Sequence, residues 1–127
     1  MSSQSMKTFI SVEQGNFKMK LIIIFLNKIE YLDDLLSAFL EIGVPGATIL
    51  DSVGMGHIVS HDIPIFAGLR DFFSGSSPTN KTILMVIKKD MITKIDEVLK
   101  DVTGYHKETG IAKMISVPID GLFGFEK

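Results

Sequence analysis

Apolar residues along the chain follow two spacings, one typical of strands and one typical of helices. The continuous run 21–26 is mostly β-branched or aromatic, which indicates a strand in the middle of a sheet. Residues at helical spacing follow, up to Gly43: Ile29, Leu32, Leu35, Leu36, Phe39, Leu40 and Ile42. We expect Asn27 to cap this helix, with Glu30 completing a capping box. Residues 47–53 then predict a second strand.

The second half of the chain repeats this order of elements. Residues 82–87 predict a strand, and Asp90 is expected to cap a helix that stops near Gly104. The apolar face of that helix contains Ile92, Ile95, Val98, Leu99 and Val102. Residues 114–119 predict the last strand. Two interleaved strand-helix-strand units predict the ferredoxin-like β-α-β-β-α-β arrangement, an α/β (α+β) fold with a four-stranded antiparallel sheet and both helices on one face.

The other face of this sheet would need a cover. Apart from the N-terminal residues and the segment between the two halves, the chain has nothing left to supply one. We therefore expect oligomerisation to bury that face.

The long segment 54–80 connects the two halves. It is much longer than the usual connection between two strands, and such segments tend to be functional or disordered. Asp62-Ile-Pro64 is a helix-start signal and predicts a short helix over 63–73. Its apolar residues could pack on the body or on a neighbouring subunit, or they could form a docking surface for a partner. The candidate partner-binding residues are Ile63, Ile65, Phe66, Leu69, Arg70, Phe72 and Phe73.

Composition limits the range of functions and partners. A chain of 127 residues that is 46% hydrophobic predicts one domain, which we place at 19–127 after an N-terminal extension of unknown role, 1–18. The net charge of -2, with a single arginine, argues against nucleic acid as a partner. No apolar run is long enough to span a bilayer, so we expect no membrane insertion. The absence of cysteine suits a reducing compartment, and we expect a cytoplasmic protein.

Few residues are arranged for catalysis. His57 and His61, with Asp62 nearby, are a weak candidate for a metal site, and solvated loop histidines are the alternative. No serine lies in a nucleophile elbow. An acylphosphatase-like activity would need an arginine near the first strand, whereas Arg70 lies in the long segment. We therefore expect no enzyme activity, no catalytic residues, no metal and no required cofactor.

Glycines at the ends of the predicted strands carry the strongest functional signal. Their backbone N–H groups can approach an anionic ligand, although ordinary turns are the alternative for each. In order, the stretches 41–48 (EIGVPGAT), 51–56 (DSVGMG) and 113–120 (KMISVPID) resemble the landmarks of the PII signalling family, the nitrogen regulatory protein P-II-like group. The resemblance covers about residues 20–120. A group of PII-like proteins also shares the segment 63–70 (IPIFAGLR).

This resemblance implies a homotrimeric signal-transduction protein. An adenine nucleotide (ATP, ADP or AMP) would bind in the clefts between subunits as a regulatory ligand. The segment 54–80 would be the T-loop, which contacts a regulated partner such as a membrane transporter or an enzyme. By match, Gly110 and Lys113 would belong to the phosphate-binding B-loop. The full implied nucleotide-binding set is Gly46, Ala47, Thr48, Gly54, Gly56, Gly110 and Lys113.

Several positions differ from the family's pattern. Ala112 replaces the second B-loop glycine, Ile111 replaces an acidic residue, and the basic residues that usually follow the last strand are replaced by Leu122, Phe123 and Phe125. Ile58 replaces the glutamine that helps to bind magnesium, nucleotide and 2-oxoglutarate, so we expect 2-oxoglutarate sensing to be lost. No tyrosine in 54–80 is present for uridylylation. These differences leave an alternative function, a PII-shaped protein-interaction module that no longer binds nucleotide.

Overall fold

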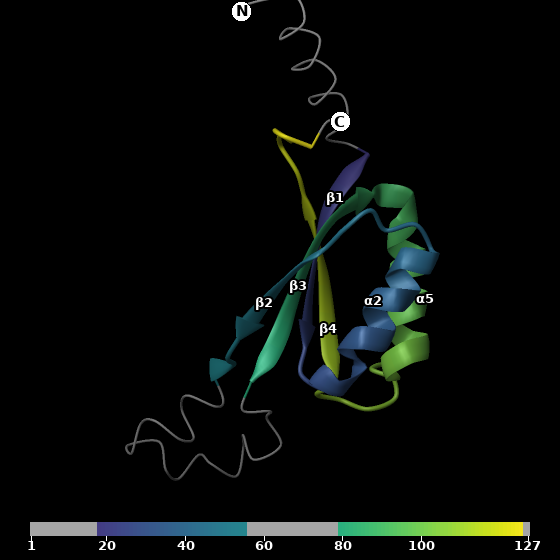
Figure 1. The fold of residues 1–127 in the computed structure, drawn as a ribbon, viewed down its shortest axis with the longest axis vertical. Helices are drawn as coiled ribbons and strands as arrows, with labels where there is room; N and C mark the ends of the chain where they lie inside the picture. Colours follow the sequence, from purple (N-terminus) through teal and green to yellow (C-terminus); the bar gives the residue numbers. More distant parts are fainter. Residues whose placement is uncertain (1–17, 56–78, 126–127) are drawn as a thin grey trace, which may run out of the picture.

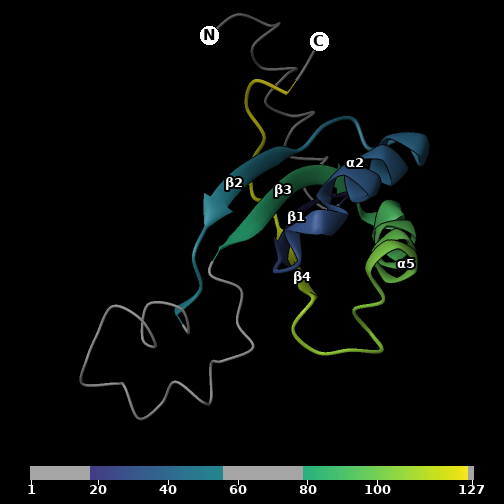
Figure 2. The same cartoon turned by 60° about the horizontal axis from the view of Figure 1, so that its bottom comes forward.

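The computed structural model of the chain describes residues 18–55 and 79–125. They form a four-stranded antiparallel sheet in the order β2-β3-β1-β4, with two helices on one face (Figures 1 and 2). The elements are β1 (Met19–Leu26), the 3-10 turn η1 (Ile29–Tyr31), α2 (Leu32–Glu41), β2 (Thr48–Ser52), β3 (Asn80–Lys88), the 3-10 turn η3 (Lys89–Met91), α5 (Ile92–Thr103) and β4 (Ala112–Pro118). The predicted ferredoxin-like arrangement is confirmed. The predicted helix over 63–73 and residues 1–17 of the predicted extension lie outside the described residues.

Strand β1 lies in the middle of the sheet, as its apolar run predicted. Ile24 is opposite Ile83 of β3 on one side and Met114 of β4 on the other. Both edges of β1 are thus hydrogen-bonded to neighbouring strands, and its β-branched residues Ile22, Ile23 and Ile24 lie at the centre of the sheet.

The hydrophobic core lies between the sheet and the two helices. The strands contribute buried residues from one face, and the helices contribute residues at helical spacing. The largest of these side chains are Ile22, Ile24, Leu26, Leu35, Phe39, Ile83, Ile87, Ile95 and Leu99, each at most 2% exposed. Burying one such side chain contributes about 1.5–3 kcal/mol, so this layer supplies most of the hydrophobic stabilisation of a single chain.

The opposite face of the sheet is also apolar. The register places Ile23 beside Leu84 and Ile115, and Phe25 beside Thr82. No helix among residues 18–55 and 79–125 covers these side chains, and Phe25, Leu50 and Ile115 are 36%, 46% and 46% exposed. We call this surface the open face, and its apolar members are Leu21, Ile23, Phe25, Leu50, Leu84, Val86, Ile115 and Val117.

The starts of both helices differ from the prediction. Helix α2 follows a 3-10 turn and has Tyr31 at its N-cap position, without a side-chain capping bond, so Asn27 is not its cap. Helix α5 likewise follows η3, with Met91 rather than Asp90 at the N-cap position. The 3-10 turns form their own backbone hydrogen bonds at these helix starts, as Tyr31 N–H does to the carbonyl of Lys28 at 3.3 Å. The capping predictions were therefore wrong.

The end of α5 and the start of β4 lie closer to their predicted positions. Helix α5 ends at the predicted glycine, Gly104, whose φ of 67° is the left-handed conformation that favours glycine. Strand β4 begins at Ala112, before the predicted start at Met114. The predicted topology is unaffected by this shift.

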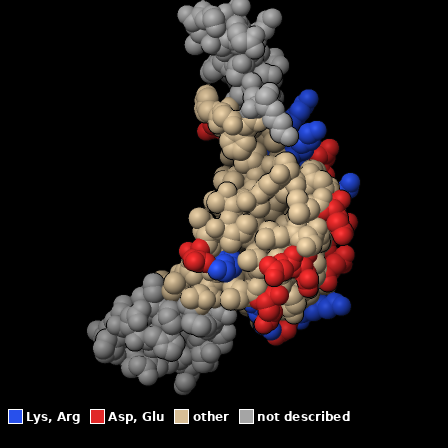
Figure 3. Space-filling view, viewed as in Figure 1, with Lys and Arg blue, Asp and Glu red and all other residues tan. Residues whose placement is uncertain are grey.

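In the view of Figure 3, charged side chains gather over the helices, whereas the surface over the strands is mostly uncharged. Asp33 and Asp34 lie in the first turn of α2, where carboxylates interact favourably with the helix dipole. Within the described ranges, neither helix is long and apolar enough to cross a membrane.

A tyrosine–carboxylate pair links the first half of α5 to the loop after this helix. Tyr105 donates a hydrogen bond to Asp96, and Lys100 Nζ lies 3.0 Å from the same carboxylate. Burial alone would raise the pKa of Asp96, but the hydrogen bonds from Tyr105 and Lys100, with the positive charges of Lys100 and His106, hold this pKa below its ordinary value. The hydrogen bond to Asp96 and partial burial raise the pKa of Tyr105 to about 12.

Replacing Tyr105 by phenylalanine is expected to make the free energy of unfolding change less between neutral and acid pH. A lowered carboxyl pKa stabilises the fold above the unfolded value of about 3.9, and this contribution is lost as pH falls through the folded pKa of Asp96. Urea unfolding should therefore show Tyr105→Phe to be about 1 kcal/mol less stable than the wild type near neutral pH, with a smaller difference near pH 3. Tyr31→Phe is the matched control. An equal difference at both pH values would contradict the assignment.

Candidate ligand site

Three of the predicted nucleotide-binding residues, Gly46, Ala47 and Thr48, line a hollow at one end of the open face. Its volume is about 500 Å³, which lies within the range of small-molecule sites. The walls come from the connection between α2 and β2, from β1 and β3, and from the C-terminal tail: Leu21, Pro45, Gly46, Ala47, Thr48, Leu84, Met85, Val86 and Phe125. The lining contains no charged side chain, and the hydroxyl of Thr48 is its one polar side-chain group. This chemistry suits a flat, largely apolar ring.

Space beside Gly46 is open. A Cβ built on this glycine would have no heavy atom within 4 Å, apart from its chain neighbours. The packing of this chain alone therefore does not require glycine at 46. A close approach by a ligand or a second chain would give such a requirement.

Phe125 is a member of the hollow that the sequence did not assign to a site. It is 63% exposed although its ring lines the hollow. Gly124, with φ of 83°, precedes it and allows a turn that other residues rarely adopt. The one sequence feature that pointed to this residue was the replacement of basic residues by apolar ones after the last strand. That feature indicated a loss of charge, but not a position in the hollow.

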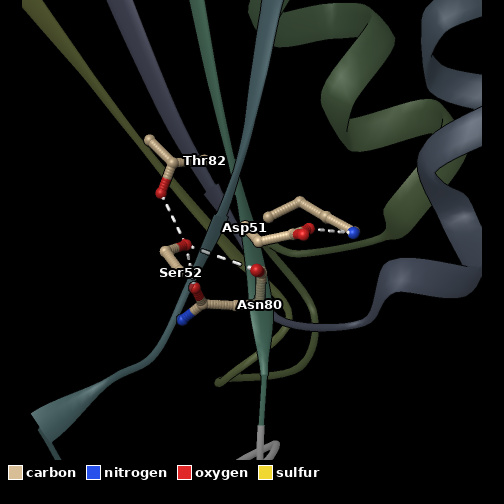
Figure 4. Close-up of polar contacts among 5 residues, drawn as sticks. Asp51, Ser52, Asn80 and Thr82 are labelled. Carbon is tan, nitrogen blue, oxygen red and sulfur yellow. Dashed lines mark hydrogen bonds and ion pairs between the residues drawn. The ribbon is translucent and has the colours of Figure 1, made fainter.

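A polar cluster lies at the other end of β2, at the base of the long segment. Figure 4 shows Ser52 between Thr82 and Asn80, with Asp51 pointing to the helical side. The Ser52 hydroxyl donates to Asn80 Oδ1 and lies 2.8 Å from the Thr82 hydroxyl. A Cβ built on Gly54 would lie 3.8 Å from Asn80 Nδ2, so the glycine is next to this cluster. Sequence reasoning missed the cluster, because its members are far apart along the chain.

The predicted B-loop residues lie at the opposite edge of the sheet, at β4 and the turn before it. Gly110 has a φ of 84°, which favours glycine at this turn. Lys113 lies on β4 opposite Phe25 and is exposed. Ile111 is 2% exposed and belongs to the hydrophobic core, and the neighbouring Ala112 is also buried. The apolar residues at 111 and 112 therefore have a structural role.

The described candidate residues fall into two groups, which we call half-sites because each would be one half of the predicted nucleotide site. One half-site, on β2 and its two ends, holds Gly46, Ala47, Thr48 and Gly54. The other, at β4, holds Gly110 and Lys113. Strands β3 and β1 lie between them, which separates the two edges by about 14 Å at the usual strand spacing. Gly56 and the seven candidate partner-binding residues at 63–73 lie outside the described residues.

No group of three or more His, Cys, Asp or Glu side chains that could hold a metal is found within 18–55 and 79–125. The weak candidate at His57 and His61 falls outside those ranges. His106 is exposed, and its ring contacts that of Tyr105 edge-on at a centroid distance of 6.0 Å.

Comparisons with known proteins identify the fold. No protein-family model matches the chain, and none of the curated proteins does. Among solved structures, the chain is similar to a functionally unknown protein from Pediococcus pentosaceus ATCC 25745, with 17% identity and a TM-score of 0.57, covering 85% of this chain and 98% of that one. It is also similar to Arabidopsis thaliana PII bound to citrate, with 20% identity and a TM-score of 0.56, covering 80% of this chain and 78% of that one. The chain thus has a ferredoxin-like α+β fold that it shares with a PII protein, and identities this low carry the fold alone.

Proposed function

We propose that the protein is a PII-like signal-transduction protein that binds an adenine nucleotide between subunits and regulates a partner through residues 54–80. It works by binding rather than by catalysis. The observation that carries the proposal is the division of the candidate residues into two half-sites on opposite edges of one sheet. Neither half is a complete nucleotide site by itself. A complete site forms when the β2 edge of one copy meets the β4 edge of another.

The open face supplies a reason for copies of the chain to associate. Its apolar side chains have no covering helix within the described part of the chain, and large exposed apolar patches mark interaction surfaces. A cyclic assembly uses the same two edges of every copy, so each interface would join one β2 half-site to one β4 half-site. A homotrimer built in this way would contain three equivalent clefts.

Each half-site would bind a different part of the nucleotide. The apolar hollow at Gly46–Thr48 suits the adenine ring, and the Thr48 hydroxyl could bond to it. Lys113, with the backbone N–H groups near Gly110, would bind the phosphates. A nucleotide regulates the partner only if it binds two states of the 54–80 segment with different affinity.

Calorimetric titration with ATP, ADP and AMP tests this proposal. We expect micromolar binding of at least one nucleotide to the full chain, weakened at least about tenfold by Lys113→Ala, because a charge-assisted contact to phosphate contributes about 1.5–3 kcal/mol. Lys107→Ala, at another exposed lysine of the same region, is the matched control and should bind as the wild type does. Equal binding by the two variants would reject the role of Lys113.

The uncharged lining of the hollow favours a second candidate function. With Phe125 in the hollow and Phe123 76% exposed, the C-terminal tail adds apolar surface where the PII family has basic residues. A PII-shaped interaction module that binds a partner without nucleotide would have this chemistry. The absence of heat with any of the three nucleotides would favour this alternative over the sensor.

A further inference from the structure

A row of polar side chains crosses the sheet at the end where β2 finishes and β3 begins. Ser52 of β2, Asn80 of β3 and Asn27 after β1 each contribute one side chain, and we call these three residues the polar row. The Ser52 hydroxyl donates to Asn80 Oδ1. Asn80 Nδ2 donates to Asn27 Oδ1 at 3.1 Å, and Asn27 Nδ2 donates to the carbonyl oxygen of Gly110 at 3.1 Å. The row therefore runs without interruption from β2 to the turn before β4.

All the hydrogen bonds of the polar row point in one direction. Each asparagine accepts through its oxygen on the β2 side and donates through its nitrogen on the β4 side. Hydrogen bonds in such a chain polarise and strengthen one another. A carboxamide can both accept and donate, whereas a carboxylate only accepts. Both positions therefore need a side chain that accepts and donates, and a carboxylate at either would interrupt the row.

The polar row meets one residue of each half-site. On the β2 side, Nδ2 of Asn80 lies 3.8 Å from the position that a Cβ on Gly54 would take. At the other end, Asn27 holds the turn by two bonds, one from its side chain to Gly110 and one from its backbone N–H to the carbonyl of Ile111 at 2.8 Å. The row thus connects residues that the sheet otherwise keeps on opposite edges.

We propose that Asn27 and Asn80 are positioning residues that couple the two half-sites of one chain. A displacement at either end changes a hydrogen bond of the row, so the turn at Gly110 and the chain at Gly54 move together. An ion pair between Lys28 and Glu108, 3.5 Å apart, joins the turn region to the end of β1 as well, but both side chains are exposed and such pairs contribute little. In an assembly, the coupling would pass the occupancy of one cleft to the next. That use rests on the proposed function, whereas the coupling itself does not.

Amide hydrogen exchange of the full chain, followed by NMR without any ligand, tests the coupling. We expect Ser52→Ala to make the Asn27 amide exchange about fivefold faster, as expected for one weakened hydrogen bond, although strand β3 lies between the mutation and this amide. Asn80→Asp, which keeps the acceptor and loses the donor to Asn27, should have the same effect. Amides in the middle of β1, such as that of Ile24, report global unfolding and should change much less.

Asp51→Asn is the matched control, because Asp51 is next to Ser52 but pairs with Lys81 on the other side of the strand. It should leave exchange at Asn27 within about twofold of the wild type. Unchanged exchange at Asn27 in both Ser52→Ala and Asn80→Asp would overturn the proposal, as would an equal acceleration at Ile24. Because no nucleotide is present, this result is independent of the calorimetric test of the proposed function.

Discussion

Replacing Ile115 by aspartate is expected to convert an assembled protein into a folded monomer. Ile115 lies on the open face beside Ile23, in the sheet row that also contains Leu84 and Thr48. In the proposed trimer it would be buried, and burying an unpaired carboxylate costs several kcal/mol. The dissociation constant of the assembly should rise more than about 100-fold, which corresponds to about 3 kcal/mol. Light scattering coupled to size-exclusion chromatography measures the change in mass.

The variant should keep its fold, because Ile115 is 46% exposed in a single chain and makes no large contribution to its core. Circular dichroism would check this. Leu40→Asp is the control, since Leu40 is 69% exposed on the helical side and should not affect the assembly. A monomeric wild type, or an Ile115→Asp variant with the mass of the wild type, would contradict assembly through the open face.

Replacing Ile24 by alanine is expected to cause the largest loss of stability of a single chain. Ile24 is fully buried at the centre of β1, between Ile83 and Met114 of the neighbouring strands. Removing most of its side chain leaves a cavity that the close-packed sheet and helices fill only partly. The expected cost is about 2–5 kcal/mol, a large share of the roughly 5–15 kcal/mol typical of a domain. Urea unfolding at one fixed protomer concentration measures the loss.

Two further variants, one at Ile24 and one at its neighbour Ile23, test whether the loss comes from the core position of the Ile24 side chain. Ile24→Val should cost only about 0.5–1.5 kcal/mol, because it removes one methylene. Ile23→Ala changes the next residue, whose side chain is on the open face, and should affect assembly more than the stability of the monomer. A loss below about 1 kcal/mol for Ile24→Ala would be inconsistent with the core position of this side chain.

The resemblance of short stretches to PII landmarks predicted candidate residues, but it could not place them relative to one another. Gly46 and Thr48 do lie together at one hollow, because they are neighbours along the chain. Lys113 lies on the opposite edge from Gly54, because the order of strands puts β3 and β1 between them. Phe125 reaches the hollow through a turn of the C-terminal tail. No periodicity in the sequence could predict such a contact.

Asn27 illustrates the limit of local reasoning most clearly. Its position before a helical pattern favours a capping role, and residue spacing gives no sign of another partner. The antiparallel register instead brings it beside Asn80, and the turn after α5 brings Gly110 within reach of its amide. A polar side chain binds the best-placed partner in space, and that partner is distant along the chain.

The sequence by itself determined the order of strands and helices, the central place of the first strand and the apolar character of both sheet faces. These properties follow from hydrophobic periodicity, which acts locally along the chain. Only the tertiary structure decided the helix caps, the polar row, the apolar hollow with Phe125 and the division of the candidate residues into two half-sites. Each of these depends on contacts between strands or loops that are far apart in sequence, and such contacts exist only once the sheet has its order and register.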